Sequence, residues 1–121
     1  MYQHSFEKLV VWQESIDLVE LIYTVTKKFP SDEKFGLISQ MKRATVSISS
    51  NLAEGTARKT NKDKAHFSTL AFSSTMEILC QIIISKRLKF ISEEEYLSLR
   101  EKVFKISNML KALRKSQLNS Y

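Results

Sequence analysis

The sequence predicts an all-α fold, an antiparallel up-down-up-down four-helix bundle. Apolar residues recur at steps of three and four along four separate stretches, which is the period of an amphipathic helix. Two glycines and one proline in 121 residues are too few for the many tight turns of an all-β fold. The connections between the stretches are short, which favours antiparallel neighbours. A chain of this length is typical of one domain, here 1–121.

The first helix is expected at about residues 6–29. Ser5 is the expected N-cap, and Pro30 should end the helix because the residue before a proline is pushed out of the helical region. Two apolar stripes run along it: Leu9, Trp12, Ile16, Val19 and Tyr23, and Val11, Leu18, Ile22, Val25 and Phe29. Such a wide apolar face predicts contact with two neighbours, or with one neighbour and another subunit.

The second helix is expected at about residues 33–55, with Gly36 as an irregularity near its start. Its apolar stripe is Leu37, Met41, Ala44, Ile48 and Leu52. Small polar residues lie between these positions: Thr45, Ser47, Ser49, Ser50 and Asn51. They are mediocre helix formers, so tertiary packing must hold this helix, and their size lets a neighbour approach closely. Gly55 is predicted to end the helix in the left-handed conformation.

The polar residues of the middle helices are interpreted first as a structural network of Ser47, Asn51, Glu54, Ser74 and Glu77. A functional polar site around Asn51 and Glu54 and a subunit interface are the alternatives. Paired carboxylates can perform acid–base chemistry. Nothing else in the sequence completes an active site, so Glu54 and Glu77 are expected to bind serines or Arg43 instead.

The third helix is expected at about residues 61–89, opened by a capping pair of Thr60 and Asp63. It has two predicted stripes: Ala65, Phe72, Met76, Leu79 and Ile83, and Phe67, Ala71, Ile78 and Ile82. The connection before it is strongly basic, with Arg58, Lys59, Lys62 and Lys64. This segment is either a solvated loop or a patch that contacts phosphates at a helix N-terminus.

The fourth helix is expected at about residues 93–116. Ser92 and Glu95 form a capping box at its start, and the last residues, 116–121, are expected to fray. A heptad seam follows the box: Tyr96, Leu99, Val103, Ile106, Leu110 and Leu113. The opposite face is basic, through Arg100, Lys102, Lys105, Lys111, Arg114 and Lys115.

The chain has 19 basic and 13 acidic residues and a net charge of +6. The excess lies mainly between residues 42 and 64 and between residues 100 and 115. Positive charge favours anionic partners, of which nucleic acid is the usual one, although a solvated basic face is the alternative. The candidate phosphate-binding residues are Lys42, Arg43, Arg58, Lys59, Lys62, Lys64, Arg114 and Lys115.

Catalytic residues, metal ligands and cofactors are not predicted. The chain has only two histidines, and the nearest approach to a bundle metal motif is a single Asp63-x-x-His66. Cys80, the one cysteine, lies in an apolar run and is expected to be a buried free thiol, which fits a cytoplasmic protein. The N-terminal residues do not resemble a signal peptide, and no uncharged apolar window is long enough to predict a membrane span.

Four segments carry a resemblance to a known family: Phe6-x-x-Leu9-x-Val11-Trp12-Gln13, Phe29-Pro30-x-x-Glu33-x-Phe35-Gly36-Leu37, Ser39-Gln40-x-x-Arg43-Ala44-x-x-Ser47-Ile48-x-x-Asn51-Leu52-Ala53-Glu54-Gly55 and Ser74-x-x-Glu77. The pattern resembles the four-helix-bundle family named for proteins encoded in intervening sequences of bacterial 23S rRNA genes. It is also similar to the accessory variability protein of diversity-generating retroelements. The fourth helix matches by its apolar pattern alone.

This resemblance implies a small cytoplasmic bacterial bundle without known enzymatic activity. It also implies a ring-like homo-oligomer, a pentamer. In the retroelement relatives, a basic bundle works with a reverse transcriptase and nucleic acid.

Three functions follow as hypotheses. The first is a non-enzymatic, oligomeric bundle that binds RNA or DNA through phosphate contacts. The second is a protein–protein scaffold or accessory subunit that docks a partner such as a reverse transcriptase, which the wide apolar face of the first helix would serve. The third, an uncharacterised enzyme, is disfavoured because no catalytic constellation appears.

Overall fold

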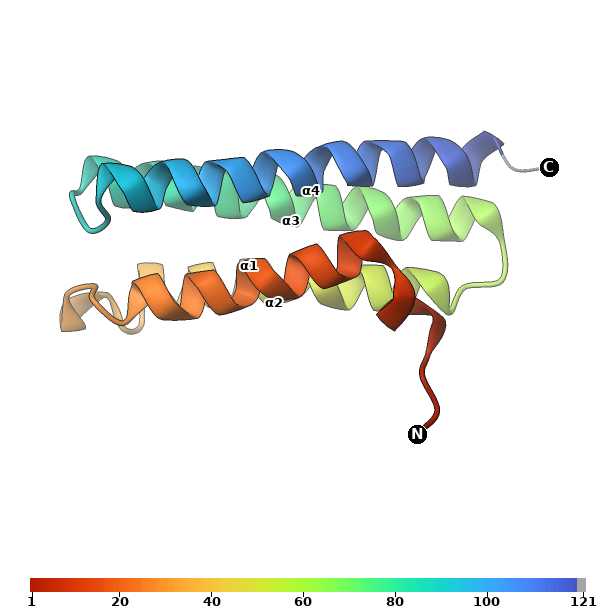
Figure 1. Ribbon diagram of the computed structural model, residues 1–121, viewed down its shortest axis with the longest axis horizontal. Coiled ribbons are helices and arrows are strands. Elements are labelled where there is room, and N and C mark those ends of the chain that lie inside the picture. The colour runs from red at the N-terminus through yellow and green to blue at the C-terminus, as the bar shows by residue number, and fades with distance from the viewer. Residues whose placement is uncertain (120–121) are drawn as a thin grey trace.

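Four long helices make up the computed structural model, which describes residues 1–119 of the chain (Figure 1). They are α1 (Val10–Thr26), α2 (Leu37–Thr56), α3 (Asn61–Arg87) and α4 (Glu93–Asn119), with short 3-10 turns η1 (Ser5–Lys8) and η2 (Ser31–Glu33) before α1 and α2. Consecutive helices run in opposite directions, and the described residues contain no strand. The predicted all-α, up-down-up-down four-helix bundle is confirmed.

The core is a single apolar cluster to which every long helix contributes. The largest side chains that are almost completely buried include Leu18 and Ile22 of α1, Met41 and Ile48 of α2, Ile78 and Ile82 of α3, and Leu99, Ile106 and Leu110 of α4. The stripes predicted for α2 and α4 are therefore core stripes. Of the two stripes on α1, the one through Leu18 and Ile22 is buried, and the one through Trp12 and Ile16 is half-buried.

The ends of α1 and α2 differ from their predicted positions. Ser5 belongs to the separate turn η1 rather than capping α1, since Leu9 is extended and interrupts the helix. The helix ends at Thr26, four residues before Pro30, and Lys27–Phe29 form turns. The second helix begins at Leu37 instead of residue 33, because η2 occupies Ser31–Glu33.

Gly55 was predicted to end α2 in a left-handed conformation, and this prediction is wrong. It lies inside α2, and neither glycine has a positive φ. A Cβ at Gly55 would lie 2.9 Å from Cβ of Phe67 on α3, closer than carbon atoms can approach. The glycine is therefore required by the close approach of two helices.

The turn between α3 and α4 is a Schellman motif built without glycine. Lys89 adopts the left-handed conformation with φ 65°, the Phe90 N–H donates to the Ser85 carbonyl at 2.9 Å, and the Lys89 N–H donates to the Lys86 carbonyl at 3.0 Å. This ends α3 at Arg87, two residues before its predicted end. The capping box that starts α4 is confirmed, since Ser92 N–H donates to Glu95 Oε1 and Glu95 N–H donates to Ser92 Oγ.

Helix α4 is longer than expected at its C-terminal end. The helix continues through Asn119, where fraying from residue 116 was predicted, and Ser68 Oγ on α3 donates to Gln117 Oε1 at 2.7 Å. Residues 120–121 of the predicted tail lie outside the described residues.

The face that α3 turns to the core also differs from expectation. Its buried residues are small or polar at several turns: Ala65, Ser68, Ala71, Thr75, Gln81 and Ser85. Met76, predicted in an apolar stripe, is exposed, and so is Cys80, which was predicted to be a buried thiol. Cys80 is two residues from Ile78, about 200° around the helix, so the two side chains point to opposite sides.

Helix α3 also contains an 18-residue window with a mean hydropathy of 1.5. Its length and composition alone would let it cross a membrane, which is weak evidence because core helices of bundles meet the same criterion. In this structure α3 packs lengthwise against both α2 and α4.

Candidate nucleic-acid interface

The N-terminal segment, the α2–α3 connection and the end of α4 meet at one end of the bundle (Figure 1). We call this end, residues 1–9, 54–66 and 111–119, the basic end. It contains eight basic and three acidic residues, so it carries +5 of the net charge of +6. The opposite end, residues 27–37 and 86–95, has six basic and five acidic residues. The fold therefore concentrates charge that the sequence distributes over three segments.

The point at which α3 begins determines where four of these cations lie. Thr60 Oγ1 accepts a hydrogen bond from the Asp63 N–H at 3.1 Å and so caps the helix, as predicted. Arg58 and Lys59 consequently lie in the connection, and Lys62 and Lys64 lie in the first turn of α3. Lys64 is half-buried and the other three are exposed.

Neighbouring rings and hydroxyls orient several of the cations without neutralising them. The Arg58 guanidinium lies 4.5 Å from the centroid of the Phe67 ring, and Lys111 Nζ lies 5.6 Å from that of Phe72. Arg114 Nε donates to Thr69 Oγ1 at 2.9 Å. These contacts hold the cations in place and leave their charge available to an anion.

The ion pairs of the molecule lie elsewhere. Among residues 1–119, acidic groups pair with Lys28, Arg43, Lys86, Lys102 and Lys105, all of them outside the basic end. The eight cations of the basic end thus have no acidic partner within the described part of the chain. They are Lys8, Arg58, Lys59, Lys62, Lys64, Lys111, Arg114 and Lys115.

Two of the predicted phosphate-binding residues are not part of this cluster. Lys42 and Arg43 lie in the second turn of α2, and Arg43 is about 20 Å from the end of the helix at Thr56, at about 1.5 Å per residue. Lys42 Nζ lies 4.6 Å from the centroid of the Tyr23 ring, and Arg43 is 3.8 Å from a carboxylate oxygen of Glu77. The other six predicted residues, Arg58, Lys59, Lys62, Lys64, Arg114 and Lys115, belong to the segments that form the basic end.

A hollow of about 340 Å³ opens at the basic end, lined by residues of η1, α2, α3 and α4 and by Leu9, which precedes α1. Leu9 and Leu113 provide apolar lining, whereas Ser5, Thr56, Asn61, Lys64 and Gln117 provide polar lining. Sequence reasoning missed this hollow, because its lining comes from three stretches that are far apart in the chain, residues 5–9, 56–64 and 113–117. Lys8 was missed as well, because a single cation within the short turn η1 gives no local signal.

The polar residues between α2 and α3 form a network in part. The hydroxyls of Ser47 and Ser74 lie 2.9 Å apart across the two helices, and Asn51 Nδ2 donates to the Ser47 carbonyl at 2.9 Å. Glu77 is near Arg43 and accepts a long hydrogen bond from Gln81. Glu54 is exposed, and its carboxylate forms no hydrogen bond or ion pair within the described residues, so its expected contact with serines or Arg43 is not present there. Glu54 and Glu77 therefore do not form a carboxylate pair.

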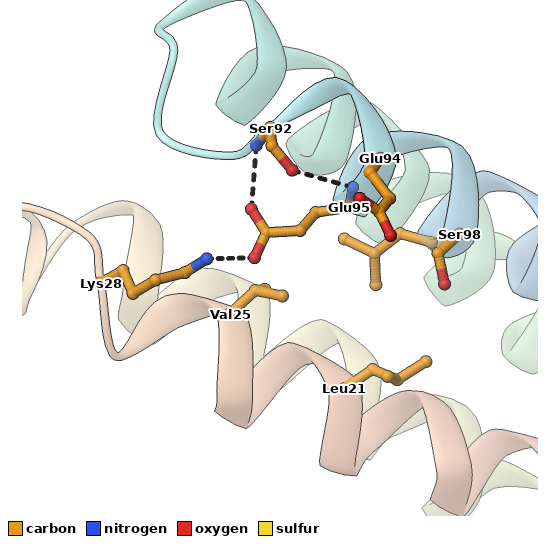
Figure 2. Close-up of a pocket in the computed structure, with 8 residues that line it drawn as sticks. Leu21, Val25, Lys28, Ser92, Glu94, Glu95 and Ser98 are labelled. Atoms are coloured by element: carbon orange, nitrogen blue, oxygen red, sulfur yellow. Dashed lines mark hydrogen bonds and ion pairs between the residues drawn. The ribbon is translucent and has the colours of Figure 1, made fainter.

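Ion pairs on the α1–α4 side of the bundle shift the pKa values of acidic groups that lie along these helices. Hydrogen bonds from Lys102 and Lys105 lower the pKa of Glu14, and a hydrogen bond from Lys28 lowers the pKa of Glu95. Lys28 and Glu95 border a groove of about 510 Å³ whose floor includes Leu21, Val25 and Leu99 (Figure 2). These shifts come from ion pairs between helices. In residues 1–119 no group of three or more His, Cys, Asp or Glu residues is arranged to hold a metal ion.

Comparisons with known proteins agree with this architecture. The family model described as 23S rRNA-intervening sequence protein matches residues 7–112. A crystal structure of a protein with unknown function from the S23 ribosomal protein family of Bacteroides thetaiotaomicron superposes with a TM-score of 0.81. The two chains are 21% identical, and the match covers 88% of this chain and 99% of that one, so this likeness supports the fold. No curated protein matches the chain.

Proposed function

Because the chain belongs to the 23S rRNA-intervening sequence protein family, whose activity is not established, we propose a function from its own surface: a non-enzymatic, oligomeric bundle that binds nucleic acid through its basic end. The observation that carries the proposal is the group of eight cations without acidic partners in the described chain. Phosphate contacts of this kind are largely independent of sequence and weaken steeply with salt. The proposed setting is the bacterial cytoplasm.

A salt series tests the proposal. The triple variant Arg58→Ala, Lys59→Ala and Lys62→Ala removes three exposed cations from the basic end. If each contacts one phosphate, the slope of log affinity against log salt should flatten by about 2 to 3, with at least about tenfold weaker binding of duplex DNA or structured RNA. The matched control is Lys27→Ala, Lys34→Ala and Arg87→Ala, three exposed cations of the opposite end that lie outside every ion pair among residues 1–119.

The two triples remove the same charge, so the comparison separates a site from net charge. Equal effects would show that only the overall charge attracts nucleic acid. Absence of binding by the wild-type protein at low salt would show that the basic end is merely solvated and would overturn the proposal.

Self-association is the second part of the proposal. An apolar face lies between α3 and α4, formed by half-buried Phe72 and Leu79 and by exposed Met76 and Phe104. We call it the α3–α4 apolar face; Phe104 is 68% exposed, which is unusual for a phenylalanine in a monomer. A pentamer, which the family resemblance implied, would carry a net charge of +30, five times that of one chain.

The oligomeric mass tests this part. Light scattering of the wild-type protein should give a multiple of 14.0 kDa, and Phe104→Ser should lower it toward 14.0 kDa. Tyr23→Ser, on the half-exposed stripe of α1, is the comparison variant, since that stripe was the alternative interface. If only Tyr23→Ser lowered the oligomeric mass, the interface between subunits would lie on α1 instead. A wild-type mass of 14.0 kDa would show that the chain is monomeric.

A scaffold that docks a protein such as a polymerase is the second candidate function, and the same α3–α4 apolar face favours it. The two functions differ in what covers Phe104. A protein that remains monomeric, binds no nucleic acid and exposes this face would favour the scaffold.

A further inference from the structure

The first six residues carry three aromatic side chains at alternate positions, Tyr2, His4 and Phe6. Their rings form a row. The centroids of Tyr2 and His4 lie 5.0 Å apart in an edge contact, and those of His4 and Phe6 lie 5.9 Å apart in a stacked contact. The row reaches α1 through Trp12, whose ring is 5.1 Å from that of Phe6. Tyr2 is 79% exposed and His4 is also exposed, so the outer part of the row faces solvent.

Hydrogen bonds hold the segment that carries these rings against the bundle. The His4 N–H donates to the Glu7 carboxylate at 2.8 Å, and Gln13 Nε2 donates to the Glu7 carbonyl at 2.9 Å. The Leu9 N–H closes the turn by donating to the Phe6 carbonyl at 3.0 Å. The rings therefore stand on a segment with a defined backbone at the basic end.

The aromatic row adjoins the hollow at that end. Ser5, which separates His4 from Phe6 in the chain, lines the hollow together with Leu9 and Lys64. The same segment thus carries the row of rings and contributes to the lining of a cavity of about 340 Å³. A hollow with both apolar and polar lining suits a flat group with hydrogen-bonding edges next to a charge, such as a nucleobase and its phosphate.

Exposed rings beside unpaired cations are the combination that binds single strands. Phosphates are attracted to the cations, while unpaired bases stack on the rings, and every base has a face that can stack. A duplex hides the faces of its bases and offers mainly phosphates, so a duplex would not use the rings.

Resting on the proposed function, we infer that the basic end selects single-stranded over double-stranded nucleic acid, by stacking unpaired bases on Tyr2 and His4. The cations Arg58, Lys59 and Lys62 supply attraction for both forms. The aromatic row supplies the preference.

Fluorescence anisotropy with an end-labelled oligouridine, an oligothymidine and a duplex of equal length tests the inference. The double variant Tyr2→Ala and His4→Ala should bind both single strands about tenfold more weakly, the effect of losing about one stacked base, and should bind the duplex within twofold of wild type. Tyr2→Phe with His4→Tyr keeps the rings and should restore single-strand binding. Phe35→Ala, which removes a 90% exposed ring at the opposite end, is the matched control and should change nothing.

The outcomes distinguish a failure of this inference from a failure of the proposed function on which it rests. Equal loss for single strands and duplex, or no loss for either, overturns the stacking role and leaves phosphate binding intact. Wild-type protein that binds neither form at low salt overturns the proposed function itself. A loss confined to the oligouridine or to the oligothymidine supports the inference and assigns the surface to RNA or to DNA.

Discussion

The α2–α3 side and the α1–α4 side of the bundle are held together by different side chains. Between α2 and α3 the groups are small, with Gly55 against Phe67 and the hydroxyls of Ser47 and Ser74 2.9 Å apart. On the α1–α4 side, ion pairs between long side chains, Glu14 with Lys102 and Lys28 with Glu95, lie at the edge of the core beside a groove of about 510 Å³ (Figure 2). Close packing should not tolerate added atoms, whereas partly exposed ion pairs at the edge of the core should tolerate the loss of one partner better.

The largest expected effect is at Gly55. Gly55→Ala adds a Cβ 2.9 Å from Cβ of Phe67, an atom that cannot move without its backbone. We expect the free energy of unfolding to fall by about 2 kcal/mol, although alanine would be favoured over glycine by about 1 kcal/mol in an open helix. Chemical denaturation measures this. Ser50→Ala, at an exposed position of the same helix, is the control and should change stability by less than about 0.5 kcal/mol. A more stable Gly55→Ala protein would show that α2 and α3 can move apart.

A smaller effect is expected at Ser74 on the same side. Ser74→Leu places a large side chain where two hydroxyls meet, and should lower the free energy of unfolding by about 1–2 kcal/mol. Ser74→Ala removes only one hydrogen bond, since Asn51 still contacts Ser47, and should cost less than about 1 kcal/mol. If the two variants were equally stable, the size of the side chain would not matter at this contact.

On the α1–α4 side, Lys102 is the most connected cation. Its Nζ is 2.8 Å from Glu14 and 3.6 Å from Asp17, and its side chain is 22% exposed. Lys102→Met should lower the free energy of unfolding by about 1 kcal/mol or less, because Lys105 still reaches Glu14 at 3.4 Å. The more exposed Lys105 provides the comparison, and Lys105→Met should have no measurable effect. If Lys102→Met lowered the free energy of unfolding as much as Gly55→Ala does, the proposed difference between the two sides of the bundle would be contradicted.

The smallest effect is a dependence of stability on acid pH. The pKa values of Glu14 and Glu95 lie below their ordinary value of 4.5 in the folded chain, mainly because lysines donate hydrogen bonds to them. The unfolded chain therefore takes up protons first, and stability should fall as the pH drops below about 4.5 and through the lowered pKa values. Thermal denaturation at several pH values measures this, and Glu14→Gln with Glu95→Gln should flatten the dependence. If the pH dependence of stability were unchanged in this double variant, other carboxylates would be responsible for it.

Local features of the sequence determined the four helices and the starts of α3 and α4. The core stripe of α2 and the heptad seam of α4 were visible because burial on one face of a helix imposes a period on the chain. The caps at Thr60 and Ser92 were visible because their hydrogen bonds reach only three residues. The basic character of Arg58, Lys59, Lys62 and Lys64 was equally local.

Tertiary structure decided what depends on the approach of distant segments. Two stripes of α3 looked alike in sequence, but only the packing against α2 and α4 buried Ala71, Ile78 and Ile82 and left Met76 and Cys80 exposed. Gly55 is a close contact instead of a helix end because Phe67, twelve residues later, lies against it. The basic end exists because three segments meet there, and Lys42 and Arg43 are excluded from it by their distance along α2. Periodicity records which face of a helix avoids water, whereas the partner that covers that face is set by how the helices pack.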